Sequence, residues 1–454
     1  MIEIGQSINT WPQLASTVVN GAGASASIAR RILLNQLSIS GRFYVDAGEI
    51  IKEPSKPIEI PEEVKQKPEP LSKGEIEEII KLNKIEPKLD LDIDKKILEE
   101  IIKDAGLAPS SGNDQPWIFV KHDSVIYLFH DINRSWSFGD YKNKAAYTGL
   151  GAALENFLIS AKSKGFEFDY QIFPNLEEKR LVAIVFLSRK GIKADNDTQE
   201  LALALAKRVT NRKMGPRVIL PNQQEVLDAL NESIKPIEGA KLRFTQNEGA
   251  LLKLGKIISK VDRMRVFHPV GHYDFFYREM RWSSKEAEEK KDGMDINTLE
   301  IPQSGLLALK MVKEEPVIET LRDIDGGRAF EAVTTATAMA SSAMGILTMP
   351  NYSDMDFVKG GMAMERLWIK ANQMNIALHP LIAPLYLFPR ILHGKGEGLD
   401  SKMIEELWKL RTEFSEIFSD GYGEGEIFLF KIFKAEEVSA RSLRFPLEKI
   451  YLEL

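Results

Sequence analysis

The sequence of 454 residues contains no cysteine. Disulfide bonds, zinc–thiolate sites, iron–sulfur clusters and thiol nucleophiles are therefore excluded, and any redox chemistry belongs to a bound cofactor. No apolar run reaches the roughly 18–20 residues that cross a bilayer. Residues 1–5 lack the basic and apolar regions of a secretory signal. We therefore expect a cytoplasmic protein with no membrane partner.

The charge balance lacks a basic excess. The chain has 60 Lys and Arg against 66 Asp and Glu, for a formal net charge of −6. Nucleic acid is therefore not an expected partner, because its binding needs a broad positive surface. Hydrophobic residues make up 44% of the chain, which is ordinary for a globular protein. The length suggests two or three domains.

Proline is concentrated in one stretch, which predicts a linker over residues 51–72. It contains Pro54, Pro57, Pro61, Pro68 and Pro70 among lysines and glutamates, so an extended, solvated spacer is expected. Beyond it, apolar spacing predicts helices over 76–82, 97–105 and 145–164, with Asp94 capping the second. Strands are predicted over 117–120, 125–129 and 181–187. This mixed order favours an α+β fold with mixed or antiparallel sheets flanked by helices.

An internal repeat joins two distant segments. Residues 151–161 (GAALENFLISA) align with residues 361–371 (GMAMERLWIKA) at a constant offset of 210, and Gly, Glu and Ala match outright. Two amphipathic helices can align by chance. Because the offset is about one domain length, however, we predict a duplicated domain.

The most informative stretch is residues 108–117, Ala-Pro-Ser-Ser-Gly-Asn-Asp-Gln-Pro-Trp. Its hydroxyl and amide groups can satisfy a planar heterocycle that carries both donors and acceptors. A well-capped loop is the structural alternative. The stretch resembles the Ala-Pro-Ser-x-x-Asn-x-Gln-Pro-Trp signature of the FMN-dependent nitroreductase superfamily. In that family this loop lies against the flavin, and the resemblance implies flavin contacts from Pro109, Ser110, Ser111, Asn113 and Gln115.

The family also has a basic stretch that holds the FMN phosphate. The first half has the acidic residues 86–92 (EPKLDLD) at that place, and no Arg lies between Arg42 and Arg134. The second half has residues 207–213 (KRVTNRK) there, which suit a phosphate. A solvated basic helix end is the alternative. The implied cofactor contacts of the second half are Arg208, Thr210, Asn211 and Arg212, together with Gly360, Gly361, Arg441 and Arg444. Helix packing and surface salt bridges are the alternatives for the glycines and for the last two arginines.

The first half thus has the flavin-loop motif without a basic phosphate stretch, and the second half has the basic stretch without a copy of the loop motif. The chain resembles the single-chain double-domain branch of the family, which implies two tandem nitroreductase-like domains, over 73–192 and 193–454, that form an intramolecular pseudo-dimer with one FMN site between them. The second half is longer, which predicts an insertion at about 240–330 that suits a lid over the flavin. A plain structural extension is the alternative.

The remaining patterns are weaker evidence of function. Residues 21–26 followed by Asp46 imitate a dinucleotide-binding fingerprint, but the proline linker leaves no room for a parallel sheet. Residues 1–50 instead resemble the tail of a ThiF-type adenylyltransferase domain, which implies such an enzyme as a partner. His268 and His272 stand four apart without a completing carboxylate pattern, so no metal is expected.

The sequence therefore predicts an FMN-dependent oxidoreductase with NAD(P)H as electron donor and a small molecule or peptide as substrate. The flavin carries the chemistry, so no catalytic acid or base is named. Two alternatives stay open. The chain could sequester flavin without turnover, or it could be the partner of an adenylyltransferase in peptide modification.

Overall fold

The computed structural model describes residues 67–83, 93–189, 194–215, 220, 222–418 and 424–454, with positions 26, 28–31, 33, 34 and 36 before them. The chain divides into two compact units, 1–55 and 56–454. The described positions of the first unit lie in helix, turn or bend and are exposed. The ThiF-like segment, most of the linker, residues 21–25 and Asp46 lie outside the described residues.

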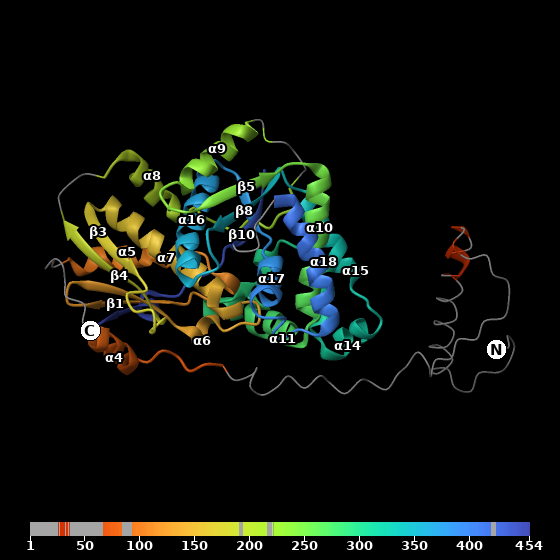
Figure 1. The fold of residues 1–454 in the computed structure, drawn as a ribbon, viewed down its shortest axis with the longest axis horizontal. Coiled ribbons are helices and arrows are strands. Elements are labelled where there is room, and N and C mark those ends of the chain that lie inside the picture. Colours follow the sequence, from red (N-terminus) through yellow and green to blue (C-terminus); the bar gives the residue numbers. More distant parts are fainter. Residues whose placement is uncertain are drawn as a thin grey trace. The chain divides into compact units, whose positions relative to one another are not determined.

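The second unit contains two main sheets (Figure 1). The first is mixed and has the order β11 (Tyr451–Glu453), β1 (Trp117–His122), β2 (Val125–His130), β4 (Leu181–Arg189) and β3 (Phe166–Ile172). The second is antiparallel and has the order β5 (Lys241–Thr245), β8 (Ala343–Met349), β10 (Gly425–Phe433) and β9 (Ala377–Pro380). A short parallel pair joins β6 (Met280–Arg281) to β7 (Met294–Asp295).

Helices flank both sheets. Those of the first part of the unit are α4 (Lys73–Asn83), α5 (Lys95–Ala105), α6 (Ile132–Ser135), α7 (Lys144–Ser163) and α8 (Asn196–Leu205). They continue with α9 (Gln223–Ile234), α10 (Glu248–Phe267), α11 (Pro269–Tyr273), α12 (Ser284–Lys290), α13 (Gln303–Lys313), α14 (Glu315–Asp323) and α15 (Arg328–Met339). The last are α16 (Asp354–Gln373), α17 (Ala383–His393), α18 (Ser401–Phe418) and α19 (Leu447–Ile450). The predicted α+β fold with mixed and antiparallel sheets flanked by helices is confirmed.

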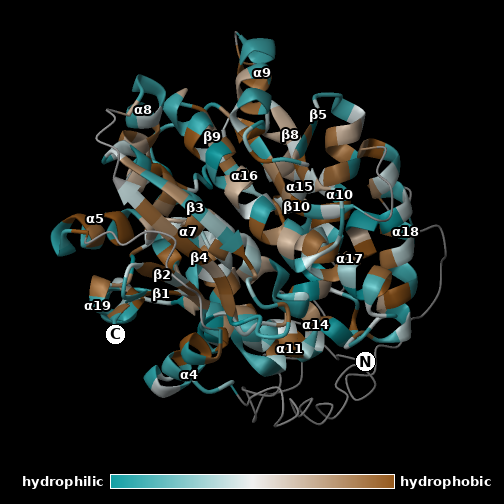
Figure 2. Ribbon diagram, turned by 60° about the vertical axis from the view of Figure 1, so that its left-hand side comes forward, coloured by the Kyte–Doolittle hydropathy of each residue, from teal (hydrophilic) through white to brown (hydrophobic). Residues whose placement is uncertain are grey.

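The predicted elements of the first half lie where the spacing placed them. The helices α4, α5 and α7 and the strands β1, β2 and β4 cover the predicted ranges. Asp94 caps α5, because its carboxylate accepts hydrogen bonds from the backbone N–H groups of Lys96 and Ile97. Figure 2 shows the result of this patterning, with hydrophobic residues along the interior strands and helices and hydrophilic residues on outward faces.

The two sheets share one strand order. The order β1-β2-β4-β3 corresponds to β5-β8-β10-β9, and every neighbouring pair in both is antiparallel. Only Asp123 and Ser124 separate β1 from β2, whereas residues 246–342 separate β5 from β8. The predicted insertion range of about 240–330 includes the strand β5. The additional segment between corresponding strands is 246–342.

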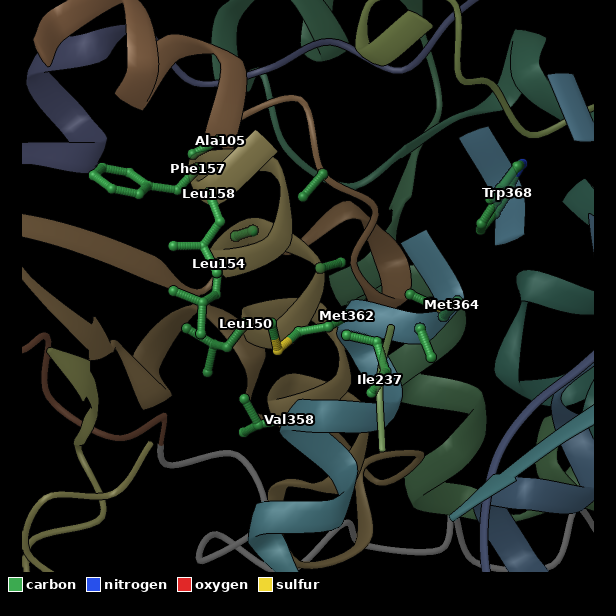
Figure 3. Packing of buried hydrophobic residues seen from close by; sticks show 14 of the residues in the cluster. Ala105, Leu150, Leu154, Phe157, Leu158, Ile237, Val358, Met362, Met364 and Trp368 are labelled. Carbon is green, nitrogen blue, oxygen red and sulfur yellow. The ribbon is translucent and has the colours of Figure 1, made fainter. Parts of the chain in front are cut away.

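The helices α7 and α16 pack side by side at the centre of the unit, and they span equivalent residues at the offset of 210. In Figure 3, Leu150 and Leu154 of α7 lie beside Val358 and Met362 of α16. Their closest approach is reciprocal. A Cβ on Gly151 would clash with the carbonyl oxygen of Val358, and one on Gly361 would clash with that of Thr148. The two contacts are related by the same offset of 210.

Lys431 is a buried cation in β10. Its Nζ donates hydrogen bonds to the carbonyl oxygens of Thr337 (3.0 Å) and Ala340 (3.3 Å) at the end of α15, where the helix dipole is negative. Burial lowers the pKa of Lys431 from 10.5 to about 8. The folded state thus disfavours the charged form, and this destabilisation is full below pH 8 and disappears as the pH rises through 10.5.

We therefore expect the free energy of unfolding to contain a component that increases by about 3 kcal/mol in total as the pH rises from 8 to 10.5. Lys431→Met should lack this component. Urea unfolding at pH 7.5 and 9.5 measures it, and Lys409→Met is the matched control, since the Lys409 side chain is 61% exposed on α18. Identical pH dependence in the Lys431→Met variant and the unmodified protein would contradict the assignment.

Candidate functional site

A cavity of about 390 Å³ lies between the loop after α5, the start of α7, the segment after α8, α16 and the carboxyl-terminal segment. It thus brings together residues from both predicted halves. Predicted site residues that line it are Pro109, Ser110, Ser111, Asn113, Arg208, Thr210, Arg212 and Arg444. Predicted residues outside its lining are Gln115, Asn211, Gly360, Gly361 and Arg441.

The loop after α5 follows an unusual backbone path. Gly112, Asn113 and Gln115 have positive φ values of 58°, 60° and 50°. Such values are rare for residues other than glycine and are maintained only when surrounding contacts determine them. One such contact is a hydrogen bond from the Gln115 backbone N–H to the Ser110 hydroxyl (2.9 Å). The loop is therefore a rigid part of the cavity wall.

The carboxyl-terminal segment holds this loop. The Asn113 Nδ2 donates to the carbonyl oxygen of Leu443 (3.1 Å), and the Asn113 Oδ1 accepts a hydrogen bond from Arg444 (2.8 Å). The Gln115 Oε1 accepts from the backbone N–H of Phe445 (2.8 Å), and its Nε2 donates to the carbonyl oxygen of Lys291 (2.8 Å). Gln115 thus positions the loop, whereas Asn113 also faces the cavity.

One end of the cavity is rich in arginine. The Nη2 of Arg208 donates to the carbonyl oxygen of Leu107 (2.8 Å), and its guanidinium lies 5.0 Å from the centroid of the Trp368 ring. Arg444 donates to the same Leu107 oxygen (3.3 Å). Burial, with the repulsion of Arg208 and Arg441, lowers the pKa of Arg444 to about 9. This end therefore has an excess of buried positive charge.

Arg212 also lines the cavity, and Arg441 lies near Arg208 and Arg444. Arg212 donates to the carbonyl oxygen of Thr298 (3.1 Å), and burial lowers its pKa to about 10. Arg441 lies outside the lining and donates to the carbonyl oxygens of Ala206 (2.9 Å) and Lys207 (2.8 Å). These carbonyls follow the end of α8, so Arg441 holds the backbone that carries Arg208.

The remaining three predicted residues lie in structural contacts. Asn211 is buried, and its Nδ2 donates to the carbonyl oxygen of Glu436 (2.8 Å). A Cβ on Gly360 would overlap the Ile427 side chain, and Gly361 approaches the backbone of α7. The packing alternative for the two glycines is therefore seen in the structure, and a flavin contact from them stays a prediction.

Other residues of the cavity lining lie outside the matched motifs, and among them the sequence indicated only Phe275, as part of the lid-like insertion. From the 246–342 segment come Asp262, Arg265, Phe275 and Glu279, and Tyr386 comes from α17. Arg265 forms an ion pair with Glu279 (2.6 Å). The Tyr386 hydroxyl lies 2.7 Å from the Ser111 hydroxyl. The sequence signal for these lining residues was the spacing of Asp262 and Arg265, three positions apart on one helix. The family motifs do not extend into this segment.

Asp140 and Lys144 also line the cavity, at the place where α7 begins. The Asp140 carboxylate accepts from the backbone N–H groups of Ala145 (2.7 Å) and Ala146 (2.9 Å), in the first turn of α7. Burial nevertheless raises the pKa of Asp140 to about 6, against the lowering effect of these bonds. Lys144 forms an ion pair with Asp354, its equivalent in α16 at the offset of 210. This part of the lining thus contains carboxylates, a lysine and aromatic side chains.

A second cavity, of about 430 Å³, lies beside the second half of α7 and the middle of α16. Glu155 and Arg366 line it and form an ion pair (2.6 Å). Glu155 is the equivalent of Glu365 at the offset of 210, but residues 86–92, the first-half stretch matched to 207–213, contain no arginine. The two cavities therefore differ in charge.

His268 and His272 make separate contacts. The His268 ring stacks on Phe138 with centroids 4.3 Å apart, and the His272 Nε2 lies 2.8 Å from the carbonyl oxygen of Val312. Among the described residues, no group of three or more His, Asp or Glu is arranged to hold a metal ion. Within the same residues, no helix is long and apolar enough to cross a membrane.

No family model matches the chain. The chain is 27% identical over 451 residues to the "Uncharacterized protein MT1398" of Mycobacterium tuberculosis (strain CDC 1551 / Oshkosh), which covers 98% of this chain and 58% of that protein. The chain thus spans little more than half the length of this relative. It is 30% identical over 79 residues to the "Putative NAD(P)H nitroreductase acg" of the same organism, covering 17% of this chain and 24% of that one.

Among solved structures, an FMN-bound nitroreductase from Bacteroides fragilis NCTC 9343 matches 54% of this chain and 95% of its own. The identity is 10% and the TM-score is 0.29. A score this low does not establish a common fold.

Proposed function

We propose that this chain is an FMN-dependent oxidoreductase of the nitroreductase type, with one flavin bound in the cavity between its two halves. The observation that carries the proposal is the arginine end of that cavity, where Arg208 and Arg444 meet the loop that contains Asn113. The local similarity to a protein named as an NAD(P)H nitroreductase supports it. The signature in residues 108–117 is a separate line of support.

The residues present fit the group. An FMN phosphate needs buried cationic donors, and the Nε of Arg444 is buried without a hydrogen-bond partner among the described residues, while that of Arg208 lies 3.2 Å from Glu365. A flavin ring needs donors and acceptors on a rigid wall, which the 109–113 loop offers. Bound FMN supplies two-electron transfer between a reduced nicotinamide and an acceptor. The protein's own part is to hold the phosphate with arginine, to orient the ring and to exclude water.

We also propose that the unit arose by duplication and acts as an intramolecular pseudo-dimer. Three features support this. The two sheets have the same strand order, α7 and α16 coincide at the offset of 210, and the contacts of Gly151 and Gly361 are reciprocal. The 246–342 segment supplies further lining, including Phe275, and a substrate would meet this ring and Tyr386 of α17. The ThiF-type partner stays a prediction.

The visible absorption spectrum of the purified protein tests the proposal, before and after reconstitution with FMN. We expect a bound-flavin spectrum that bleaches on anaerobic addition of NADH or NADPH. A bound flavin that stays oxidised would favour sequestration over turnover. A colourless protein that does not take up FMN would contradict the proposal.

A further inference from the structure

Glu365 is a fully buried carboxyl group of α16 that lies outside the cavity lining and contacts Arg208, which is part of that lining. Its Oε1 lies 3.2 Å from the Nε of Arg208. From α7, Asn156 and Glu155 face it, and from the carboxyl-terminal segment Arg444 does so. Among the described residues, Glu365 is the carboxylate that forms an ion pair with this arginine group.

The polar groups around Glu365 pair mainly with one another. The Arg208 Nε and a Glu365 oxygen form the ion pair described above, and the Asn156 side chain is hydrogen-bonded to the Glu365 carboxylate. The Nε of Arg444 is buried without a hydrogen-bond partner among the described residues. Because buried polar groups are nearly always paired, this Nε is a position for a further polar ligand.

Burial also disfavours the charged forms of Glu365 and Arg208. Burial raises its pKa to about 7, although Arg208 lowers it. Burial and the repulsion of Arg441 lower the pKa of Arg208, although Glu365 raises it. The pair therefore does not compensate its own desolvation, as is common for buried ion pairs. A dianion placed at the same arginines would repel a charged Glu365 and favour its protonation.

We infer that Glu365 is the resident counter-charge of Arg208 and Arg444, and that a phosphate monoester takes over this role while Glu365 takes up one proton from solvent. This inference rests on the proposed function, since the phosphate monoester is that of FMN. It adds that flavin uptake is coupled to pH through one buried residue. Glu365 is a positioning residue, because it acts through Arg208.

The sign follows from linkage. Well below pH 7 the Glu365 carboxyl already carries its proton, so phosphate binding is coupled to little proton uptake. Above pH 7 each binding event takes up one proton, so the affinity falls as the pH rises, by at most tenfold per pH unit. Glu365→Gln keeps an acceptor oxygen for Arg208 Nε and removes the charge. It should bind FMN about tenfold more tightly at pH 8.5 and show no pH dependence above 7.

The test is the Kd for FMN and for riboflavin, from flavin fluorescence at pH 6.5, 7.5 and 8.5. Phosphate monoesters are mostly dianions over this range, since their second pKa is about 6. Riboflavin lacks the phosphate and should show the same Kd at each pH and in each protein. Glu155→Gln is the matched control, because Glu155 is equally buried, pairs with Arg366 and lies at the second cavity. It should retain the pH dependence of the unmodified protein.

The outcomes separate the two levels of the argument. An unchanged pH dependence of FMN binding in Glu365→Gln would overturn the inference and leave the proposed function standing. Weaker FMN binding at every pH, or an equal response from Glu155→Gln, would also overturn it. A protein that binds neither flavin would overturn the proposed function. The inference is then tested by calorimetry with phenyl phosphate in the same variants, where pH-independent binding overturns it.

Discussion

Replacement of Gly361 by alanine should lower the free energy of unfolding by about 3 kcal/mol or more. The added Cβ would clash with the carbonyl oxygen of Thr148 in the backbone of α7, which cannot rotate away as a side chain can. The two helices would have to separate, and the core between them would lose its packing. Urea unfolding followed by circular dichroism measures the loss.

Gly151→Ala should have a similar effect, because its Cβ would clash with the carbonyl oxygen of Val358 in the reciprocal contact. Gly74→Ala in α4 is the matched control, since nothing lies within 4 Å of its added Cβ. Alanine there should leave the protein unchanged or stabilise it by about 0.5–1 kcal/mol, since it favours the helix. Losses of less than 1 kcal/mol at both central glycines would contradict the close approach of α7 and α16.

Asn113→Ala combined with Arg208→Ala should abolish FMN binding, with a Kd at least about 100-fold higher. The variant removes a polar contact of the predicted flavin loop and a cationic donor of the predicted phosphate site, and charge-assisted hydrogen bonds contribute about 1.5–3 kcal/mol each. The loss should be much smaller for riboflavin, because Arg208 acts on the phosphate. Titration of flavin fluorescence measures both constants.

Two controls accompany this variant. Lys88→Ala lies in the acidic stretch of the first half, outside the described residues, and should leave FMN binding unchanged. Arg208→Lys keeps the charge opposite Glu365 and protects the fold from an unpaired buried carboxylate. It should bind FMN with intermediate affinity, since lysine lacks the bidentate geometry. Equal loss from Asn113→Ala, Arg208→Ala and Lys88→Ala would contradict a single site.

The sequence predicted most local structure of the first half, because its helices have strong apolar stripes and its strands are short and apolar. The central helices were also recognisable, since equal spacing at the offset of 210 survives sequence divergence. The strand order was not accessible. The pairing of β11 with β1 joins residues more than 300 positions apart, and no local pattern specifies such a contact.

The loop of residues 109–113 and Arg208 could be placed at one cavity because their side-chain chemistry is written in short motifs. The roles of Gln115 and Arg441 could not, because each acts through backbone carbonyls far away in the sequence. Glu365 was visible only as a matched residue of the repeat. Its importance comes from burial and from the arginine beside it, which only the tertiary structure supplies.

The strand β11 has a consequence for biosynthesis. During translation, β1 emerges more than 300 residues before the strand that covers its edge. Until then β1, most of whose residues are buried in the complete sheet, is itself the edge strand, and exposed apolar edge strands can pair with other chains. The first sheet is therefore complete only after residues 451–453 have been synthesised. A chain truncated before residue 451 would leave β1 exposed and prone to aggregation.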